Sequence, residues 1–377
     1  MATRRRTSTS ENNKNTKLTL LPDPVSGFRR ILMLIMLVAA VALPCLALYN
    51  AVYPLRLFHS SPQNSLAAAN PSLDTEEVKL ERVLKAASMK DKTVIITTLN
   101  EAWAAPNSIF DLFLESFKIG ENTKGLLKHL VVIALDQKAY KRCLEVHPHC
   151  YALTVEGVDF SVEAYFMSKP YLKMMWSRID ILRVVLELGY NFLFTDADIM
   201  WFRDPFKRFY EDTDFQIATD NYALNDSYNL NNMPNGGFTY VKSNSRSIEF
   251  YKFWFTSRIK YKNKHDQSVL MLIKHDPFLT KIGLKIRFLN TMYFGGFCET
   301  SKDFNQVSTM HANCCFGLDT KIHDINIMLD DWRNYASSSP SLKSSWNSTW
   351  RVPQNCSIKN FDRDYKPKRL VQVEKKD

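Results

Sequence analysis

After residue 91 the sequence alternates short apolar runs with segments of helical periodicity, and this alternation constrains the fold more than any other feature. Residues 93–99 and 130–135 are rich in β-branched and aliphatic side chains, which is typical of buried strands. Residues 109–117 and 137–146 have helical spacing. Strands without a polar face that alternate with helices indicate a parallel sheet with helices on both faces. The sequence therefore predicts a doubly wound α/β domain over residues 91–377.

Length and composition agree with a globular protein and exclude several classes. The chain has 377 residues, of which 45% are hydrophobic and 23% charged, so it is not disordered, collagen-like or a coiled coil. Its formal net charge is +10, but half of this excess comes from a basic segment at residues 1–30. The mild remainder, together with the absence of a nucleic-acid-binding motif, predicts no nucleic-acid partner. The sequence also has no G-x-G-x-x-G or P-loop motif.

Residues 31–49 form an uncharged segment of nineteen residues, ILMLIMLVAAVALPCLALY. As a helix it would be about 28 Å long, close to the thickness of a bilayer's hydrocarbon core. Many basic residues precede it and few follow it, so the positive-inside rule orients the N-terminus toward the cytosol. A cleaved signal peptide is the alternative, because Pro44 and nearby small residues suit a cleavage region, although its apolar core is usually shorter. We predict a single-pass, type II membrane protein.

The predicted organisation has four parts. They are a basic cytosolic tail (1–30), a transmembrane signal anchor (31–53), a stem (54–90) and a lumenal domain (91–377). The first part of the stem is rich in Pro, Ser, Asn and Ala, as in flexible linkers. Its second part, residues 74–90, predicts a short helix with Asp74 as the N-cap and Glu77 at the capping-box position.

Two features fit a domain outside the cytosol. Sequons for N-glycosylation begin at Asn225, Asn347 and Asn355. Six of the seven cysteines lie beyond the apolar segment, which suits an oxidising compartment. The sequence leaves their pairing open, except that Cys143 and Cys150 could close a short loop.

A pair of aspartates directly follows a predicted strand. A helical pattern with Gly189 at its C-terminus precedes residues 191–195, an apolar strand that runs into Asp196-Ala-Asp198. Residues i and i+2 of an extended chain point to the same side, and open α/β sheets bind ligands beyond the carboxyl ends of their strands. The two carboxylates could therefore face one Mg²⁺ or Mn²⁺ ion. The plainer alternative is that both serve only as caps in a turn.

Other candidate features have simpler explanations. Two further Asp-x-Asp pairs, Asp212/Asp214 and Asp362/Asp364, follow no predicted strand, so we expect structural roles for them. Three tryptophans near the end of the domain could stack on the rings of a ligand or pack in the core, and these are Trp332, Trp346 and Trp350.

Arg178 and residues 193–205, LFTDADIMWFRDP, resemble the signature of plant nucleotide-diphospho-sugar transferases of glycosyltransferase family 77. The likeness spans roughly residues 92–325 and is strongest over 169–206. It implies a GT-A-type nucleotide-binding domain with a mostly parallel central sheet, which here would follow the single transmembrane helix. The family's members are retaining Golgi enzymes, in which Asp196 and Asp198 would bind the manganese ion that holds the donor diphosphate.

Two further motifs match the family along the chain. Asn235-Gly236-Gly237 resembles the turn that lines the donor sugar. Asp266-Gln267 resembles the element beside the anomeric carbon, so the resemblance makes Asp266 and Gln267 the catalytic residues. A hairpin turn and a helix cap are the plainer readings of these two motifs.

The resemblance also implies roles for Arg178, His311 and Lys321. Arg178 would contact the donor, His311 would be the third metal ligand, and Lys321 would meet the donor phosphate. The alternatives are an ion pair with a surface carboxylate for Arg178 and an ordinary polar contact for His311.

A physical argument explains why such an enzyme needs a cation and basic side chains. When a sugar leaves a nucleoside diphosphate, negative charge grows on the diphosphate, and a cation with basic side chains stabilises it there. The leaving phosphate can take the acceptor's proton, so we assign no nucleophile. The resemblance therefore implies a Golgi glycosyltransferase that uses Mn²⁺ or Mg²⁺ and a UDP-linked donor and that passes the sugar, with retention, to a cell-wall glycan or glycoprotein.

Two other functions stay open. A metal-dependent phosphoesterase would use the same aspartates, but it would need a second cluster of His and Asp ligands, for which the sequence gives no convincing candidate. A catalytically silent, membrane-tethered partner of other transferases would keep the fold and the motifs without turnover.

Overall fold

The computed structural model describes Met33, Met36 and residues 75–153 and 167–356. The predicted cytosolic tail, the anchor apart from those two methionines, the stem before residue 75, and Asp362 and Asp364 lie outside these residues. Among the helices that are described, none combines the length and the apolar character needed to cross a bilayer. The described residues from 75 onward belong to one compact unit.

A seven-stranded sheet runs through this unit in the order β3-β2-β1-β4-β7-β6-β8. Its strands are β1 (Thr93–Leu99), β2 (Leu130–Ala134), β3 (Cys150–Ala152), β4 (Asn191–Thr195), β6 (Phe215–Asn221), β7 (Met233–Val241) and β8 (Ile286–Phe288). The pairs β3-β2, β2-β1, β1-β4 and β6-β8 are parallel, whereas β7 is antiparallel to both of its neighbours. The expected mostly parallel sheet is therefore confirmed, with β7 as its one reversed strand in the described residues.

A second, three-stranded sheet has the order β5-β10-β9. Its strands are β5 (Ile199–Trp201), β9 (Phe294–Gly296) and β10 (Thr309–His311). β10 is antiparallel to β5 and parallel to β9. Since β5 begins three residues after Asp196, this small sheet continues directly from the exit of β4.

The described helices flank the sheet. The α-helices are α2 (Glu76–Ala87), α3 (Glu101–Ala104), α4 (Ile109–Ile119), α5 (Gln137–Val146), α6 (Lys169–Glu187), α7 (Ser245–Lys260), α8 (Asp266–Ile273), α9 (Pro277–Lys281), α10 (Leu318–Ala336) and α11 (Pro340–Ser344). Three 3-10 helices are also described, η1 (Lys124–His129), η2 (Pro205–Arg208) and η3 (Ala223–Asn225). The expected strands and helices over 93–146 and 191–195 are confirmed within two residues at their ends.

The predicted N-terminus of α2, the helix expected over residues 74–90, is wrong in detail. α2 begins at Glu76, with Thr75 as its N-cap, and the Thr75 hydroxyl accepts a hydrogen bond from the backbone N–H of Val78. Neither Asp74 as the cap nor Glu77 at the third helical position fits this register. Thr and Asp are both good N-caps, so two adjacent candidates left the first turn ambiguous in the sequence.

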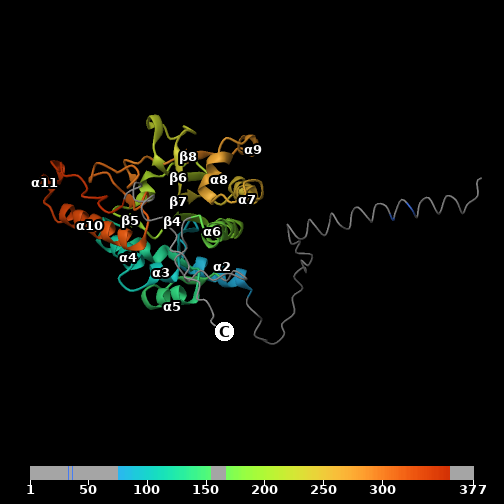
Figure 1. Ribbon diagram of the computed structural model, residues 1–377, viewed down its shortest axis with the longest axis horizontal. Helices are drawn as coiled ribbons and strands as arrows, with labels where there is room; N and C mark the ends of the chain where they lie inside the picture. The colour runs from blue at the N-terminus through green and yellow to red at the C-terminus, as the bar shows by residue number, and fades with distance from the viewer. Residues whose placement is uncertain (1–32, 34–35, 37–74, 154–166, 357–377) are drawn as a thin grey trace, which may run out of the picture. The chain divides into compact units, whose positions relative to one another are not determined.

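Alternate side chains of the strands face two separate cores. In β1, Val94 and Ile96 pack with side chains of α2, α6, α7 and α8, while Ile95 and Leu99 pack with α4, α5 and α10. Figure 1 shows α6, α7 and α8 on one side of the sheet and α4 and α10 on the other. The sheet is thus buried on both faces, which explains why its strands have no polar face.

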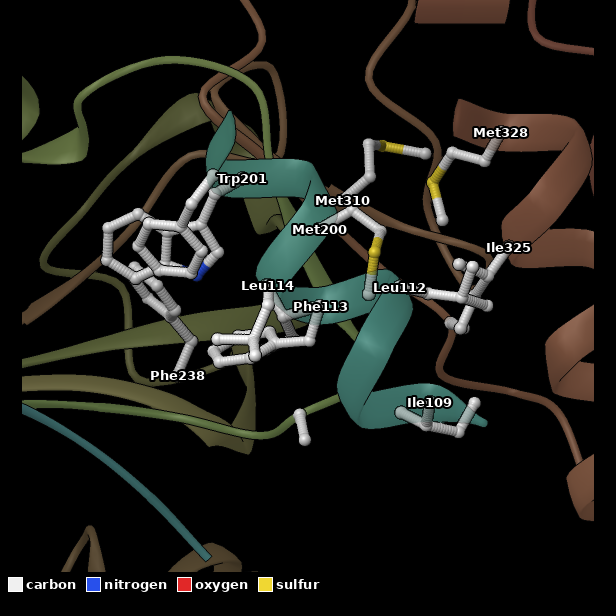
Figure 2. Close-up of a cluster of buried hydrophobic side chains, with 14 of the residues drawn as sticks. Ile109, Leu112, Phe113, Leu114, Met200, Trp201, Phe238, Met310, Ile325 and Met328 are labelled. Atoms are coloured by element: carbon white, nitrogen blue, oxygen red, sulfur yellow. The ribbon is translucent and has the colours of Figure 1, made fainter. Parts of the chain in front are cut away.

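Large side chains fill the core between the two sheets. Figure 2 shows Met200 and Trp201 of β5, Met310 of β10 and Phe238 of β7 beside side chains from α4 and α10. Trp201 stacks on Phe117 of α4 with ring centroids 4.4 Å apart. Close packing of this kind fixes β5 and β10 in position, and with them the residues that follow each strand.

The tryptophans near the end of the domain belong to the same core. Trp332 is fully buried and Trp350 is nearly so, and Trp346 packs against the edge of this core while remaining partly exposed. Trp332 and Trp350 are therefore core residues and not a platform for acceptor sugars.

Three disulfides join the described cysteines. Cys143–Cys150 closes the short loop that the spacing suggested. Cys298–Cys314 and Cys315–Cys356 diverge from two adjacent residues to different parts of the chain. The segment around residues 314–315 is consequently tied on two sides.

Candidate active site

Two aspartates stand where β4 ends. Asp196 follows the strand directly, and its backbone N–H continues the β4–β7 ladder by donating to the carbonyl of Gly237, 2.7 Å away. The chain then turns, with the N–H of Ile199 donating to the carbonyl of Asp196, and enters β5. The side chain of Asp196 is 26% exposed and that of Asp198 only 2%. The carboxylates thus lie at the carboxyl end of a central strand, as predicted.

The small sheet brings His311 to this pair. β10 is antiparallel to β5 and pairs His311 with Ile199, the residue after Asp198. As a result, His311 Nε2 lies 3.1 Å from Oδ1 of Asp198. One ligand atom from each of Asp196, Asp198 and His311 lies within 4.8 Å of the others. The structure therefore brings together the three side chains predicted to bind a metal.

One oxygen of Asp198 has no hydrogen bond from any described group. Its Oδ2 accepts from the ammonium of Lys321, which also donates to the carbonyl of Ala312 at 2.8 Å. Its Oδ1 is buried, and the nearby His311 ring does not meet hydrogen-bond geometry. Leaving a buried carboxylate oxygen without a donor is costly in free energy. An oxygen of this kind, beside an imidazole nitrogen, suits a metal ion.

The surrounding charges set the pKa values of the two aspartates apart. Burial would raise the pKa of Asp198, but Lys321 and His311 outweigh it and hold that pKa well below its ordinary range. For Asp196, burial raises the pKa above its ordinary value, and the nearby Arg178 offsets this only in part. Asp198 thus has the lower pKa of the pair.

Arg178 bridges Asp196 to a third buried carboxylate. Its guanidinium contacts Oδ1 of Asp196 at 3.0 Å and Oδ2 of Asp266 at 2.5 Å, and it lies over the Phe194 ring. The Arg178 side chain is 6% exposed, which excludes the alternative of a surface ion pair. Burial would raise the pKa of Asp266, but Arg178 keeps it below the ordinary value. Arg178 thus ties α6 to both the β4 exit and α8.

Asp266 is not a helix cap. It is the first residue of α8, the N-cap is His265, and the cap makes no side-chain hydrogen bond. The carboxylate of Asp266 is 1% exposed and engages Arg178 instead. The capping alternative is therefore wrong.

Asn235, Gly236 and Gly237 lie inside β7 and not in a turn. Both the predicted turn and the hairpin alternative are wrong. The register of β7 against β6 shifts between Thr239 and Asn235, and the residues between them form a β-bulge. A bulge detaches the strand locally from one neighbour, and here the backbone of Gly237 lies against Asp196.

Gly237 has no room for a side chain. A Cβ atom there would lie 2.6 Å from Oδ2 of Asp196 and 2.7 Å from Cε1 of His311. At Gly236 the nearest atoms, from Arg178 and Asp266, would be 3.5 Å away, which is ordinary contact. The second glycine is therefore required by the close approach of the backbone to the aspartate–histidine cluster.

Side-chain amides hold the backbone of the bulge. The side-chain oxygen Oε1 of Gln267 accepts a hydrogen bond from the backbone N–H of Gly236 at 3.0 Å. The side-chain oxygen Oδ1 of Asn235 accepts one from the backbone N–H of Gly237 at 2.9 Å. Gln267 and Asn235 therefore lie beside the aspartates, together with the other residues that the sequence grouped with them.

The sequence analysis missed two residues at this place. Asp220, at the carboxyl end of β6, accepts hydrogen bonds from the side-chain amides of Asn235, Gln267 and Asn313. Trp103 follows β1 in α3, and its ring centroid lies 5.6 Å from the ammonium of Lys321. Trp103 follows the end of a strand as Asp196 does, and Asp220 is the second-to-last residue of β6. This positional rule could have found Trp103, but β6 was not predicted.

The remaining predicted positions lie on the surface. Asn225, Asn347 and Asn355, the sequon residues, are exposed. Asp214 is buried against Arg246 at 2.7 Å, and Asp212 pairs with Arg287 at 3.3 Å, so this second Asp-x-Asp pair has the structural role expected.

Comparison with known proteins identifies the chain's relatives. Residues 125–325 match the family described as nucleotide-diphospho-sugar transferase. The chain belongs to this family. The transferase is 52% identical over 279 residues to the uncharacterized protein At4g15970 of Arabidopsis thaliana, covering 74% of this chain and 73% of that protein. It is 38% identical over 304 residues to At1g28695 of the same plant, also uncharacterized, covering 77% and 90%.

A relative with a named activity is more distant. The transferase is 27% identical over 240 residues to UDP-D-xylose:L-fucose alpha-1,3-D-xylosyltransferase 1 of Arabidopsis thaliana, covering 63% of this chain and 64% of that protein. The predicted family is thus confirmed, and these findings support a glycosyltransferase.

The arrangement joins negative and positive groups beyond the carboxyl end of β4. Asp196, Asp198 and His311 offer ligands for a divalent cation, while Lys321 and Arg178 supply fixed positive charge beside them. Such a combination can hold a diphosphate and stabilise charge that develops on it.

Proposed function

We propose that this transferase is a metal-dependent, retaining glycosyltransferase of the Golgi lumen that moves a sugar from a UDP-linked donor to a cell-wall glycan or glycoprotein. The observation that carries the proposal is the convergence of Asp196, Asp198 and His311 at the exit of β4. Family membership supports a nucleotide-sugar donor. The names of a UDP-D-xylose-dependent relative and of an arabinosyltransferase relative, both from Arabidopsis thaliana, support a donor of this class.

The residues present fit a hard cation. Asp196, Asp198 and His311 would hold it, and two carboxylates with one imidazole suit Mn²⁺ or Mg²⁺. The buried Asp198 oxygen without a described donor supports this assignment. Bound there, the cation would supply positive charge where the donor diphosphate gains negative charge.

The chain's own side chains add to this effect. Lys321 is held by Asp198 and the carbonyl of Ala312, so its ammonium is positioned before a ligand arrives. Arg178 keeps Asp266 ionised and fixed, which leaves that carboxylate poorly placed to act as a free nucleophile. Asp266 and Gln267 then position the donor sugar, and the leaving phosphate accepts the acceptor's proton.

The cellular setting belongs to the same proposal. The apolar segment at 31–49, with basic residues before it, supports a type II anchor whose catalytic domain faces the lumen. Three disulfides and three exposed sequon asparagines in the described residues are consistent with a secretory compartment.

A donor panel tests the chemistry. The full-length chain, purified in detergent, is incubated with Mn²⁺ and a series of UDP-sugars, and release of UDP and of sugar is measured. We expect release from at least one donor and a fall of at least 100-fold in Asp198→Ala. Asp212→Ala is the matched control, since it removes an aspartate from the other Asp-x-Asp pair and should leave release within about twofold.

Two results would overturn the proposal. Phosphoester hydrolysis without sugar release would indicate a phosphoesterase. Against this, Asp196, Asp198 and His311 form one cluster, and no second group of metal ligands occurs over residues 75–153 and 167–356. Inactivity toward every donor, with UDP and Mn²⁺ binding retained, would indicate a silent partner of other transferases.

A further inference from the structure

One half-buried carboxylate gathers amides from three separate parts of the chain. Asp220 Oδ1 accepts from Asn235 Nδ2 of β7 at 2.7 Å and from Asn313 Nδ2 after β10 at 2.8 Å. Its Oδ2 accepts from Gln267 Nε2 of α8 at 3.0 Å. None of the ion pairs among the described residues involves Asp220, and the side chains that donate hydrogen bonds to it are these three amides.

Each of the three amides also accepts a backbone hydrogen bond through its carbonyl oxygen. Asn235 receives the N–H of Gly237 and Gln267 that of Gly236. Asn313 receives the N–H of Cys298 at 3.1 Å. An ionised carboxylate only accepts, so it forces every amide nitrogen toward itself and every amide oxygen toward the backbone. The charge of Asp220 thereby sets the orientation of all three amides.

The backbone held in this way belongs to the candidate active site. Gly236 and Gly237 form the bulge whose carbonyl at Gly237 receives the N–H of Asp196. Asn313 lies two residues after His311, and it contacts the loop that carries Cys298. Asp220 therefore links β7, α8 and the segment after β10 without being one of the metal-ligating side chains.

We propose that Asp220 is a positioning residue of the transferase: through Asn235, Gln267 and Asn313 it fixes the glycine bulge and the Gln267 side chain against the donor sugar. The proposal rests on the proposed function for the nature of the ligand. Its structural part, the orientation of three amides by one charge, stands independently. In Asp220→Asn the side chain keeps its size but loses one acceptor oxygen and presents a donor to donors.

Hydrogen exchange tests the structural part without any activity. We expect the backbone amides of Gly236, Gly237 and Cys298 to exchange at least tenfold faster in Asp220→Asn, with the amides of β1 and β2 unchanged. The matched control is Asp214→Asn, at the other end of β6, which removes a buried carboxylate bonded to Arg246, Asn244 and the N–H of Lys285. Asp214→Asn should leave those three amides unaffected.

Donor kinetics and UDP affinity test the functional part. In Asp220→Asn we expect kcat/KM for donor hydrolysis to fall at least tenfold while the Kd of UDP with Mn²⁺ changes less than threefold, because UDP lacks the sugar. In a Gln267→Ala background the same substitution should cost less than it does alone, since the two act as a unit.

The outcomes separate the two proposals. Unchanged exchange at all three amides, or a loss of UDP affinity equal to the loss of kcat/KM, would overturn the positioning role. If the wild-type chain turns over no donor but exchange responds as expected, the amide network stands and the proposed function fails.

Discussion

Two neighbouring glycines in β7 differ sharply in what they tolerate. A Cβ on Gly237 would press into Asp196 and His311, whereas one on Gly236 would meet only ordinary contacts. The difference arises because the two positions face different neighbours, Arg178 and Asp266 at Gly236 and the aspartate–histidine cluster at Gly237. At the scale of single residues, the candidate site thus requires that residue 237 have no side chain, as well as requiring Asp196 and His311 themselves.

Gly237→Ala should weaken cation binding strongly, while Gly236→Ala retains it. The added methyl at residue 237 displaces either Asp196 or His311, and both are in the proposed ligand set. Titration of Mn²⁺ followed by electron paramagnetic resonance measures the effect, and we expect at least a 30-fold weaker Kd for Gly237→Ala. Equal affinities in the two variants would show that the glycine backbone does not shape the metal site.

At the scale of elements, the segment from β10 into α10 carries His311 and Lys321 and is held at both sides. Cys298–Cys314 ties it to the loop after β9, and Cys315–Cys356 ties it to the chain beyond α11. Asp324, fully buried in α10, also accepts backbone N–H groups from Gln354, Asn355 and Cys356. These connections hold two of the proposed ligand-contacting residues in one rigid unit.

Removing the Cys298–Cys314 disulfide should weaken cation binding. Replacing both cysteines by serine frees the segment three residues after His311, and we expect the Kd of Mn²⁺ to rise about tenfold. The equivalent change at Cys143–Cys150, which lies in the α5–β3 connection, should cost stability, on the order of 2–4 kcal/mol, without changing that Kd. A similar Kd change in both variants would mean that general loosening, and not local restraint, is responsible.

Asp324→Asn should reduce the change in the free energy of unfolding between neutral and acidic pH. Burial would raise the pKa of Asp324, but backbone hydrogen bonds and His323 lower it below the ordinary value of about 3.9. A lowered folded-state pKa contributes stability that is present above about pH 4 and is lost as the pH falls toward the folded pKa. Urea unfolding should therefore show a loss of about 2–3 kcal/mol in the variant at pH 7 and a smaller one near pH 3. A difference that stays constant with pH would contradict this account.

The elements that the sequence predicts well are those with strong local signals. β1, β4 and α5 have the predicted ends because their apolar runs and caps are unambiguous. The bulge at Gly236 and Gly237 was not predictable, since a register shift between strands depends on pairing and not on local pattern. Asp220 was missed for a related reason, because a carboxylate gains its role only when three distant amides converge on it.

At the scale of the whole molecule, every proposed ligand-contacting group lies near the carboxyl end of β4. These groups come from α6, β7, α8, β10, α10 and the residues that follow β4. The pairing of β4 with β1 and β7, and of β5 with β10, accounts for this convergence. The domain also has exposed sequon residues, and the N-terminal apolar segment predicts which side of a membrane it occupies.

The full-length protein should carry N-glycans and resist protease in sealed microsomes. Asn225, Asn347 and Asn355 are exposed, and sequons are modified only in the secretory lumen. Treatment with peptide-N-glycosidase should increase gel mobility, and the triple Asn→Gln variant should lose that shift. A tag at the N-terminus should be digested in intact vesicles while the domain is protected. An accessible, unglycosylated domain would reverse the predicted orientation.

The reversed direction of β7 has a consequence for how such an enzyme can diversify. Because β7 is antiparallel to both of its neighbours, its N-terminal part lies beside the carboxyl end of β4. The connection from Asn221 to Met233 leads into β7 at this end. We expect insertions in that connection to leave the glycine pair in place. Loss of one residue between Thr239 and Val241 would instead shift the register of Gly236 and Gly237 by one residue. The carbonyl of Gly237 would then no longer face the N–H of Asp196. The connection can therefore vary in length during evolution, whereas the length of β7 cannot.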